Sequence, residues 1–358
     1  MGKKQDFLAM ESNFFLGQDS FHFLANWLKL QKYSQVVVLV DRNTKQFCYP
    51  LIKDFLPENH FLIEIPAGEL HKNLQTCHQI WAKLTTWAID RKALLVNLGG
   101  GVLCDIGGFC AATYKRGIDF VHIPTTLLAQ VDACFGGKLG IDFQGFKNQI
   151  GVFALPKHVL VNPTFLHTLP KRELYAGFAE VIKHSLIADA EHFQFLVTLE
   201  RQFSTHLHEI VYHSIKIKNQ IVEQDFKEQH LRKTLNFGHT VGHAIESFLL
   251  QFPERAILHG EAIVVGMLCE AWLAMKRNLL PKTDFEQIWA YLTHIYPQKI
   301  VFSPEEVSEI AKLCLQDKKN THRQILLATL EQIGKAVFDV PVTLGEIEQA
   351  LYFYLKNL

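Results

Sequence analysis

The pattern of hydrophobic and polar positions changes along the chain and divides it into two regions. In the first region, short runs rich in Val, Ile and Leu alternate with longer stretches whose apolar residues recur every three or four positions. Continuous apolar runs separated by helices are typical of a parallel sheet that is covered on both faces. The pattern predicts strands at residues 36–40, 60–65, 93–99, 120–124 and 158–162, and a helix at 73–90.

The second region is predicted to be helical. Only residues 323–330 have the character of a short strand. Two prolines within residues 162–170 mark the boundary between the regions. We therefore expect an α/β domain with a Rossmann-like, mainly parallel sheet over residues 1–165, an all-α domain over residues 166–358, and a ligand site in a cleft between them. Helical spacing is clearest in residues 171–189, 208–225, 239–250 and 260–277.

Composition excludes several classes of protein. Lys plus Arg and Asp plus Glu both number 36, and this balance argues against a nucleic-acid-binding surface. No apolar run approaches the roughly 18–20 residues that cross a bilayer, and the N-terminus lacks the apolar core of a signal peptide. The seven cysteines are scattered without a CxxC motif, so we expect reduced thiols and a cytoplasmic protein.

Polar residues near the ends of the predicted strands are candidates for a nucleotide site. Glycines at residues 99–101 could let the backbone approach a pyrophosphate, although the spacing is not GxGxxG and a structural turn is an equal alternative. Asp41 and Asn43 could accept hydrogen bonds from ribose hydroxyls or could cap a helix. Glu69 and Lys72 could form only an exposed helical ion pair.

Residues 116–151 combine cations, glycines and hydroxyl groups around an apolar strand, which suits the binding of a phosphate. The alternative is a set of surface lysines, which the Gly-Gly-Lys context disfavours. The polar and glycine positions in this stretch are Arg116, Thr125, Thr126, Asp132, Gly136, Gly137, Lys138, Lys147 and Asn148.

The second region contains a candidate metal site. Glu180 and Lys183 stand three apart on one face of a predicted helix. His239 and His243 stand four apart, and His259 comes from a separate segment. A continuous helix would place both histidines on one stripe with Arg232 and Asn236. A carboxylate and imidazoles would hold zinc with an open position, although a chain with 18 histidines brings some together by chance.

Taken together, the motifs resemble those of the 3-dehydroquinate synthases, a family of sugar phosphate cyclases. The motifs GGGVxxDxxGF, YKRG, IPTTLLAQVD, GGK, GFKNxIG, LPxRExxxGxAEVIK, LNFGHTxGHAIE and HGEA occur in the family's order, from about Val36 to Lys319. The resemblance implies a dehydroquinate synthase-like fold and conversion of 3-deoxy-D-arabino-heptulosonate 7-phosphate, a phosphorylated sugar acid, to 3-dehydroquinate and phosphate in the shikimate pathway. It also implies NAD, one divalent metal per subunit (zinc or cobalt) and a homodimer.

The resemblance implies a role for each matched residue. The implied metal ligands are Glu180, His239 and His259. The implied catalytic residues are Glu228, His243, Lys183 and Asp132, with His243 as an acid–base or phosphate-side group. The implied substrate-binding residues are Lys218, Arg232 and Asn236, and for the phosphate Lys138, Asn148, Arg116 from a neighbouring subunit and one of Lys318 and Lys319. The implied NAD-binding residues are Asp41, Asn43, Glu69, Lys72, Gly100, Gly101, Asp105, Thr125, Thr126, Lys147 and Thr168.

The sequence departs from the family pattern at three positions. Cys104 stands where the family often has glycine, and Leu139 and Asp142 alter the commoner GGKTGVN. Asp142 adds a negative charge near the predicted phosphate pocket. Three other functions remain open: a cyclase of sedoheptulose 7-phosphate, a metal- and NAD-dependent polyol dehydrogenase, and an inactive NAD-binding scaffold.

Overall fold

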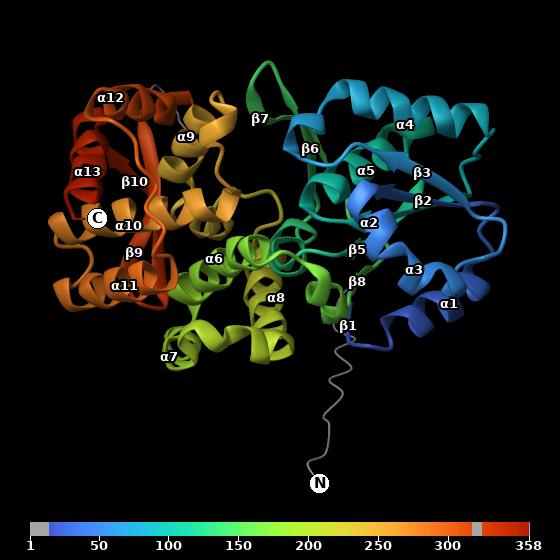
Figure 1. The fold of residues 1–358 in the computed structure, drawn as a ribbon, viewed down its shortest axis with the longest axis horizontal. Coiled ribbons are helices and arrows are strands. Elements are labelled where there is room, and N and C mark those ends of the chain that lie inside the picture. The colour runs from blue at the N-terminus through green and yellow to red at the C-terminus, as the bar shows by residue number, and fades with distance from the viewer. Residues whose placement is uncertain (1–13, 317–323, 358) are drawn as a thin grey trace, which may run out of the picture. The chain divides into compact units, whose positions relative to one another are not determined.

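The computed structural model describes residues 14–316 and 324–357, and it divides into two compact units between Leu174 and Tyr175. The division falls in the first turn of helix α6 (Lys171–Ala188). Each unit has its own arrangement of elements, coloured blue to green for the first and green to red for the second (Figure 1).

Unit 1 contains a six-stranded parallel sheet with the strand order β1-β8-β5-β4-β2-β3. All five predicted strands are present, which confirms the fold class of this region, and the short strand β1 pairs with β8 at one edge. The strands are β1 (Phe14–Leu16), β2 (Val36–Asp41), β3 (Phe61–Ile65), β4 (Leu94–Gly99), β5 (Asp119–Pro124) and β8 (Val159–Val161).

Helices cover both faces of this sheet (Figure 1). Alternate strand residues point to opposite faces, so Leu39 and Leu95 pack against one layer of helices while Val38 and Val96 pack against the other. Burial on both faces explains why the strands are almost uniformly apolar. The first layer contains α4 (Leu74–Thr86) and α5 (Gly101–Thr113), and the second contains α1 (Ser20–Gln31) and α3 (Tyr49–Ile52).

The chain reverses its direction across the sheet between β2 and β4. It runs outward from β2 to β3, returns to place β4 beside β2, and then continues to β5 on the other side. In open α/β sheets, ligands bind beyond the carboxyl ends of the strands at such a reversal. Asp41 ends β2 and Gly99 ends β4, so the polar residues predicted for a nucleotide follow the two strands that flank the reversal.

Unit 1 also contains an antiparallel hairpin that the sequence analysis did not predict. Its strands are β6 (Lys138–Phe143) and β7 (Phe146–Phe153), and α5 packs against β6. The hairpin therefore takes up much of the cation- and glycine-rich stretch that was predicted to bind a phosphate.

Unit 2 is built mainly from helices. Helix α10 (His259–Lys276) is buried on all sides over most of its length and packs against α9, α11, α13 and the strand β9 (Ile325–Gln332). A helix that is apolar around its whole circumference needs such a position. The other helices are α7 (Ala190–Leu199), α8 (Leu207–Gln224), α9 (His239–Leu249), α11 (Lys282–Ile295), α12 (Pro304–Leu313) and α13 (Leu344–Lys356).

Unit 2 also contains an antiparallel hairpin, in which β9 (Ile325–Gln332) pairs with β10 (Lys335–Val342). The predicted short strand corresponds to β9. β10 was not predicted, because Pro341 and the register shift between Val337 and Val340 interrupt its pattern. Across the described ranges, no helix combines the length and the apolar character needed to cross a membrane.

Candidate active site

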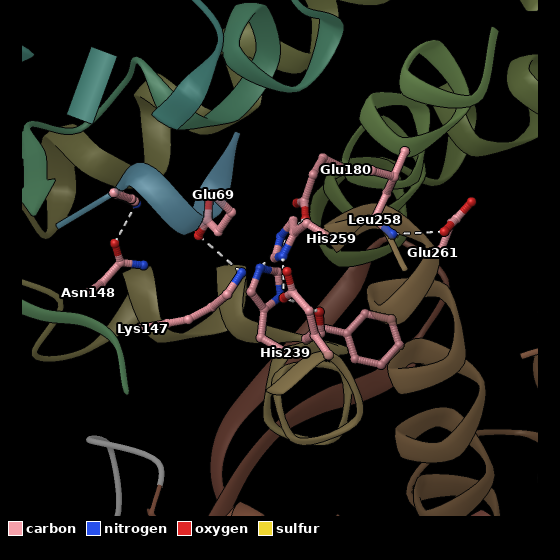
Figure 2. A network of polar contacts seen from close by, with 11 residues as sticks. Glu69, Lys147, Asn148, Glu180, His239, Leu258, His259 and Glu261 are labelled. Atoms are coloured by element: carbon pink, nitrogen blue, oxygen red, sulfur yellow. Dashed lines mark hydrogen bonds and ion pairs between the residues drawn. The ribbon is translucent and has the colours of Figure 1, made fainter. Parts of the chain in front are cut away.

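Glu180, His239 and His259 converge in unit 2. Glu180 lies in α6, His239 is the first residue of α9, and His259 is the first residue of α10. The Oε1 atom of Glu180 is 3.5 Å from Nε2 of His239 and 3.4 Å from Nε2 of His259. Figure 2 shows both imidazoles directed at this carboxylate, which is completely buried. Three residues that are up to 79 positions apart in the sequence therefore present their donor atoms to one point.

The spacing of these donor atoms suits a metal ion. Zinc binds imidazole nitrogen and carboxylate oxygen at about 2.0–2.2 Å, so a tetrahedral arrangement separates two ligand atoms by about 3.3 Å. The separations of 3.4 and 3.5 Å from Glu180 match this value. The electrostatics of His259 also favour a cation at this site. Burial alone would lower the pKa of His259, but the Glu246 and Glu180 carboxylates outweigh burial and raise the pKa of His259 to about 9. A site that favours positive charge on an imidazole also favours a cation.

His243 lies close to the same point. Its ring centroid is 5.0 Å from that of His239 and 5.5 Å from that of His259, and one ring nitrogen from each of the three histidines lies within 4.8 Å of the others. The pair is one helical turn apart in α9, as its spacing predicted. His243 therefore lies next to the donor atoms of His239 and His259. This position is compatible both with a fourth metal ligand and with an acid–base group.

Lys183 lies beside the same carboxylate. Its ammonium forms a salt bridge with Glu180 on the same face of α6, as the spacing of three residues predicted, and both side chains are buried. The positive charge of Lys183 offsets part of the cost of burying the Glu180 carboxylate.

The condition for a shared stripe of Arg232, Asn236, His239 and His243, a continuous helix, is not met. Gly238 adopts φ +79°, in the left-handed region, and this interrupts the helical conformation between the 3₁₀ turn η7 (Leu231–Asn236) and α9. The break lets Asn236 turn to another partner, and its Nδ2 donates to Oε1 of Glu228 at 2.9 Å.

The loop before η7 is organised by Asp225. Its carboxylate accepts hydrogen bonds from the backbone N–H groups of Gln229, His230 and Arg232 at 2.7–3.0 Å. Burial alone would raise the pKa of Asp225, but these hydrogen bonds outweigh burial and hold the pKa below its usual range. Arg232, of which 1% is exposed, donates from Nη1 to the carbonyl of Phe226. The predicted substrate-binding cation Lys218 is also buried, in α8.

In unit 1, the nucleotide candidates lie beyond the carboxyl ends of the strands. Asp41 is the N-cap of α2 (Arg42–Phe47) and forms a capping box with Thr44, so the helix-cap alternative for this residue is realised. Gly100 is the N-cap of α5 and Gly101 its first residue. Thr125 and Thr126 follow β5, and the N–H of Thr125 donates to the carbonyl of Gly99 at 3.0 Å.

Lys72 and Glu69 do not realise the alternative of an exposed helical ion pair. Lys72 is buried, and its Nζ donates to Oδ2 of Asp105 and to Oδ1 of Asn148, each at 2.6 Å. Glu69 instead forms an ion pair with Lys147 at 3.1 Å (Figure 2). The hairpin β6–β7, which carries Lys147 and Asn148, is thereby joined to the loop after β3.

The remaining predicted residues of unit 1 are dispersed around these elements. The carboxylate of Asp142 accepts a hydrogen bond from the backbone N–H of Asn148 at 2.8 Å. This bond links the two strands of the hairpin β6–β7. Asn43 lies exposed in α2, Arg116 is exposed at the end of the turn Tyr114–Arg116, and Lys138 begins β6. Thr168 ends the 3₁₀ turn Pro163–Thr168, and Asp132 lies in the turn Ala129–Ala133. Lys318 and Lys319 lie outside the described residues.

Three predicted site residues adopt a strained backbone conformation. Arg116 has φ +65°, Asn148 has φ +51° and Glu228 has φ +59°. A positive φ is uncommon for residues other than glycine and often marks a functional position, because the surrounding structure must hold the conformation in place.

Unit 1 also brings together three side chains of metal-ligating type that no spacing in the sequence predicted. Cys104 of α5, His122 of β5 and Cys134 are buried with one Sγ or ring nitrogen each within 4.8 Å of the others. All seven cysteines are free, as expected. Burial alone would raise the pKa of Cys104, but Cys134 and His122 lower it to about 6.

Two carboxylates near the imidazoles were missed by the sequence analysis. Oε2 of Glu246 is 3.2 Å from Nδ1 of His259, and Glu270 accepts hydrogen bonds from the N–H groups of Gly238 and Val241. A signal for Glu270 was present, since it is a lone acid within the apolar stretch of α10. Glu246 lies seven residues after His239, on the same helical face.

The fold is similar to those of solved sugar phosphate cyclases. ValA, the 2-epi-5-epi-valiolone synthase from Streptomyces hygroscopicus subsp. jinggangensis 5008, solved with NAD+ and Zn2+ bound, has a TM-score of 0.84 and 26% identity, covering 97% of this chain and 98% of that one. A 2-deoxy-scyllo-inosose synthase complexed with carbaglucose-6-phosphate, NAD+ and Co2+ has a TM-score of 0.83 and 24% identity over 94% and 95% of the two chains. The chain therefore has the fold of these sugar phosphate cyclases.

Sequence relatives define the family. The 3-dehydroquinate synthase of Parabacteroides distasonis is 39% identical over 93% of this chain and 95% of its own length, and that of Sulfurovum sp. is 40% identical over 78% and 79%. The family models for the N-terminal and C-terminal parts of 3-dehydroquinate synthase match residues 62–176 and 177–320. The chain belongs to the 3-dehydroquinate synthase family.

Proposed function

We propose that this protein is an enzyme that converts 3-deoxy-D-arabino-heptulosonate 7-phosphate into 3-dehydroquinate and phosphate, in the shikimate pathway of aromatic amino acid biosynthesis. The observation that carries the proposal is the convergence of Glu180, His239 and His259 in a chain of this family. The reaction includes an oxidation, loss of phosphate, a reduction and closure of a carbocycle, so it requires both a hydride carrier and a Lewis acid.

The cofactors of the proposed reaction are NAD and one divalent cation per subunit. When bound, NAD accepts and later returns one hydride, and the divalent cation acts as a Lewis acid toward the substrate hydroxyls. Zinc suits the donor set of one carboxylate and two imidazoles, and cobalt accepts the same ligands. ValA has been solved with NAD+ and Zn2+, and the inosose synthase with NAD+ and Co2+.

Glu180, His239 and His259 hold the cation in this proposal, and three ligands leave coordination positions for substrate. His243 stands beside them and moves a proton at the substrate. Lys183 forms a salt bridge with Glu180 and contacts a ring hydroxyl. An imidazole suits proton transfer because its ordinary pKa lies close to neutral pH.

The two anionic ends of the substrate require separate cations. In this proposal Arg232 and Lys218 bind the carboxylate, and Arg232 suits this task because its guanidinium can hold two oxygen atoms at once. Asn236 and Glu228 orient nearby hydroxyl groups and each other through their hydrogen bond. Phosphate binding is assigned to Lys138, Asn148, Arg116 and one of Lys318 and Lys319.

NAD binding is assigned to unit 1, at the reversal of strand order between β2 and β4. Asp41 and Asn43 contact ribose hydroxyls, and Gly100 and Gly101 offer backbone N–H groups to the pyrophosphate. Asp132, which also lies in unit 1, is assigned to a substrate hydroxyl and not to NAD. The other residues assigned to NAD are Glu69, Lys72, Asp105, Thr125, Thr126, Lys147 and Thr168.

The proposal includes a cytoplasmic homodimer. Seven free cysteines agree with a reducing compartment. The exposed Arg116, in its strained turn, is the residue that we expect to reach a phosphate site in the second subunit. Sedimentation of the purified protein would test the dimer, and complementation between inactive Arg116 and His239 variants would test the shared site.

The purified protein should be assayed with 3-deoxy-D-arabino-heptulosonate 7-phosphate and, in parallel, with sedoheptulose 7-phosphate. We expect phosphate and 3-dehydroquinate to form in equal amounts from the first compound, with no accumulation of NADH. Turnover of sedoheptulose 7-phosphate alone would identify a different cyclase. Net NADH formation would identify a dehydrogenase, and the absence of phosphate release from both compounds would favour a scaffold.

A further inference from the structure

Two buried carboxylates support the two histidine-bearing helices from opposite directions. Glu246 belongs to α9 and contacts His259 at the start of α10, with Oε2 3.2 Å from Nδ1. Glu270 belongs to α10 and contacts the start of α9, where its carboxylate accepts hydrogen bonds from Gly238 N at 2.6 Å and Val241 N at 3.1 Å. Each helix therefore supplies one imidazole at its first residue and one carboxylate that contacts the start of the other helix.

The contact with Glu246 determines which nitrogen of His259 carries the proton. A carboxylate accepts hydrogen bonds, so Nδ1 of His259 donates to Glu246, and Nε2 is the ring nitrogen left to face a cation. That Nε2 is the atom 3.4 Å from Glu180. A metal-binding histidine usually donates its other ring N–H to a carboxylate or a carbonyl, because this orients the ring and makes the ligand nitrogen more basic.

The contact with Glu270 holds the first turn of α9. The first N–H groups of a helix have no partner within the helix, and the N-cap residue Gly238 has no side chain to supply one. Glu270 is completely buried and provides the acceptor from α10. The same turn carries His239, whose Nδ1 is 3.1 Å from the carbonyl of Phe237, so this ring too presents Nε2 to Glu180.

Close packing of the two helices makes these contacts available. A Cβ atom on Gly266 would lie 1.8 Å from the carbonyl oxygen of Gly238, so only glycine allows α10 to approach the start of α9 this closely. Burial of a carboxylate is costly unless hydrogen bonds and positive charge compensate for it. The N-terminus of α9 offers both, because its N–H groups point toward Glu270 and the helix dipole is positive there.

We propose that Glu246 and Glu270 are positioning residues for the metal site, with Glu246 setting the tautomer and orientation of His259 and Glu270 anchoring the turn that carries His239. The inference rests on the proposed metal ligands Glu180, His239 and His259. Neither carboxylate is one of the proposed ligands.

The experiment measures the affinity of the full-length protein for Zn2+ by competition with a chelator, and the absorption spectrum of the Co2+-loaded protein. Glu246→Gln and Glu270→Gln should each weaken Zn2+ binding by about 10- to 100-fold and change the Co2+ spectrum. Affinity for NAD, which is assigned to unit 1, should stay within about twofold of the wild type. Glu246→Asp, which keeps the charge, should recover part of the lost affinity.

Glu346→Gln is the matched control. Glu346 forms a capping box at the start of α13 in the same unit, so it undergoes the same chemical change in a helix cap without contact to an imidazole. Its Zn2+ affinity should equal that of the wild type. Wild-type Zn2+ affinity and an unchanged Co2+ spectrum in both Glu246→Gln and Glu270→Gln would overturn the inference, as would an equal loss in Glu346→Gln. If Glu270→Gln does not fold, Glu246→Gln alone decides, because its contact is with a side chain.

His239→Ala separates this inference from the proposed function. Retention of stoichiometric zinc in His239→Ala would refute the proposed metal ligands. Loss of zinc in His239→Ala together with wild-type affinity in the Glu246 and Glu270 variants would refute only the positioning role.

Discussion

Lys72 and Asp105 form an ion pair in the interior of unit 1, with Nζ of Lys72 2.6 Å from Oδ2 of Asp105. Only 5% of the Lys72 side chain is exposed, and Asn148 accepts a second hydrogen bond from the same ammonium. Burial alone would lower the pKa of Lys72, but the charges of Asp105 and Glu69 outweigh burial and raise it. The ammonium therefore stays charged and joins the loop after β3 to α5 and to the hairpin β6–β7.

Replacement of Lys72 with Met should destabilise unit 1 by about 2–4 kcal/mol, because it leaves Asp105, of whose side chain 15% is exposed, without its cation. Burial already raises the pKa of Asp105, and Lys72 is the main opposing charge. Urea unfolding would measure the loss of stability, and titration with NAD should show weaker binding. Lys45→Met is the control, since the Lys45–Glu64 pair has the same 2.6 Å separation at an exposed position. That change should cost less than about 1 kcal/mol, and equal losses in the two variants would contradict the role of burial.

Replacement of Arg232 with Lys should lower kcat/KM by about 10- to 100-fold, because an ammonium cannot hold two oxygen atoms of a carboxylate as a guanidinium does. Steady-state kinetics with 3-deoxy-D-arabino-heptulosonate 7-phosphate would measure the change. The control is Lys233→Arg, since the neighbouring Lys233 forms an ion pair with Asp339 on the surface and has no proposed role in binding. Unchanged kinetics in Arg232→Lys would rule out a bidentate contact.

Replacement of Gly266 with Ala should destabilise unit 2 by about 2–4 kcal/mol and weaken Zn2+ binding. The added methyl group would lie 1.8 Å from a backbone oxygen that cannot move independently of α9. Thermal unfolding and metal titration would follow the two effects. Gly345→Ala in the first turn of α13 is the control, because a Cβ there meets nothing within 4 Å. Alanine should leave stability unchanged or raise it slightly at that position, and a stable Gly266→Ala protein with wild-type metal affinity would contradict the packing argument.

The ion pair between Arg255 and Glu306 should make stability depend on pH in the acid range. The hydrogen bonds from Arg255 lower the pKa of Glu306 from 4.5 to about 2, with burial opposing the effect. A lowered pKa in the folded protein means that the contribution is fully present above pH 4.5 and is lost as the pH falls toward 2. At neutral pH it should amount to about 1 kcal/mol, because the pair is partly exposed.

The measurement compares the wild type with Glu306→Gln by thermal unfolding from pH 7 down to pH 2. Glutamine can still accept the hydrogen bond from Ser303 N at the helix cap, so the comparison isolates the charge. The wild type should be the more stable protein at pH 7, and the difference should shrink below pH 4.5. A difference that does not change across this range would show that the ion pair does not control the pKa of Glu306.

Most elements could be predicted from the sequence because their hydrophobic periods are strong. Four of the five predicted strands of the parallel sheet, β2, β4, β5 and β8, are almost wholly buried, and all five read as largely apolar runs. The hairpins β6–β7 and β9–β10 were incompletely predicted, since β6–β7 carries mixed polar residues and β10 contains Pro341. Their pairing depends on contacts with the rest of the chain, and local sequence does not encode these contacts.

The break at Gly238 shows how tertiary packing overrides a local pattern. The steps of four, three and four from Arg232 to His243 fit one helical stripe, and no proline interrupts them. The chain nevertheless turns at Gly238, because α10 approaches there and Glu270 satisfies the N–H groups that the break exposes. Local periodicity in the sequence carries no information about a partner that lies 32 residues further along the chain.

The sequence by itself determined the class of fold, the family motifs and the residue types of the candidate site, because these depend on hydrophobic period and on the chemistry of individual side chains. The tertiary structure decided which of those side chains share partners. It brought Glu180 to two imidazoles and gave Lys72 the partners Asp105 and Asn148. It also placed Glu246 against His259 and Glu270 against the first turn of α9. These relationships join residues that are distant in the chain, and only the packing of helices and strands determines which distant residues meet.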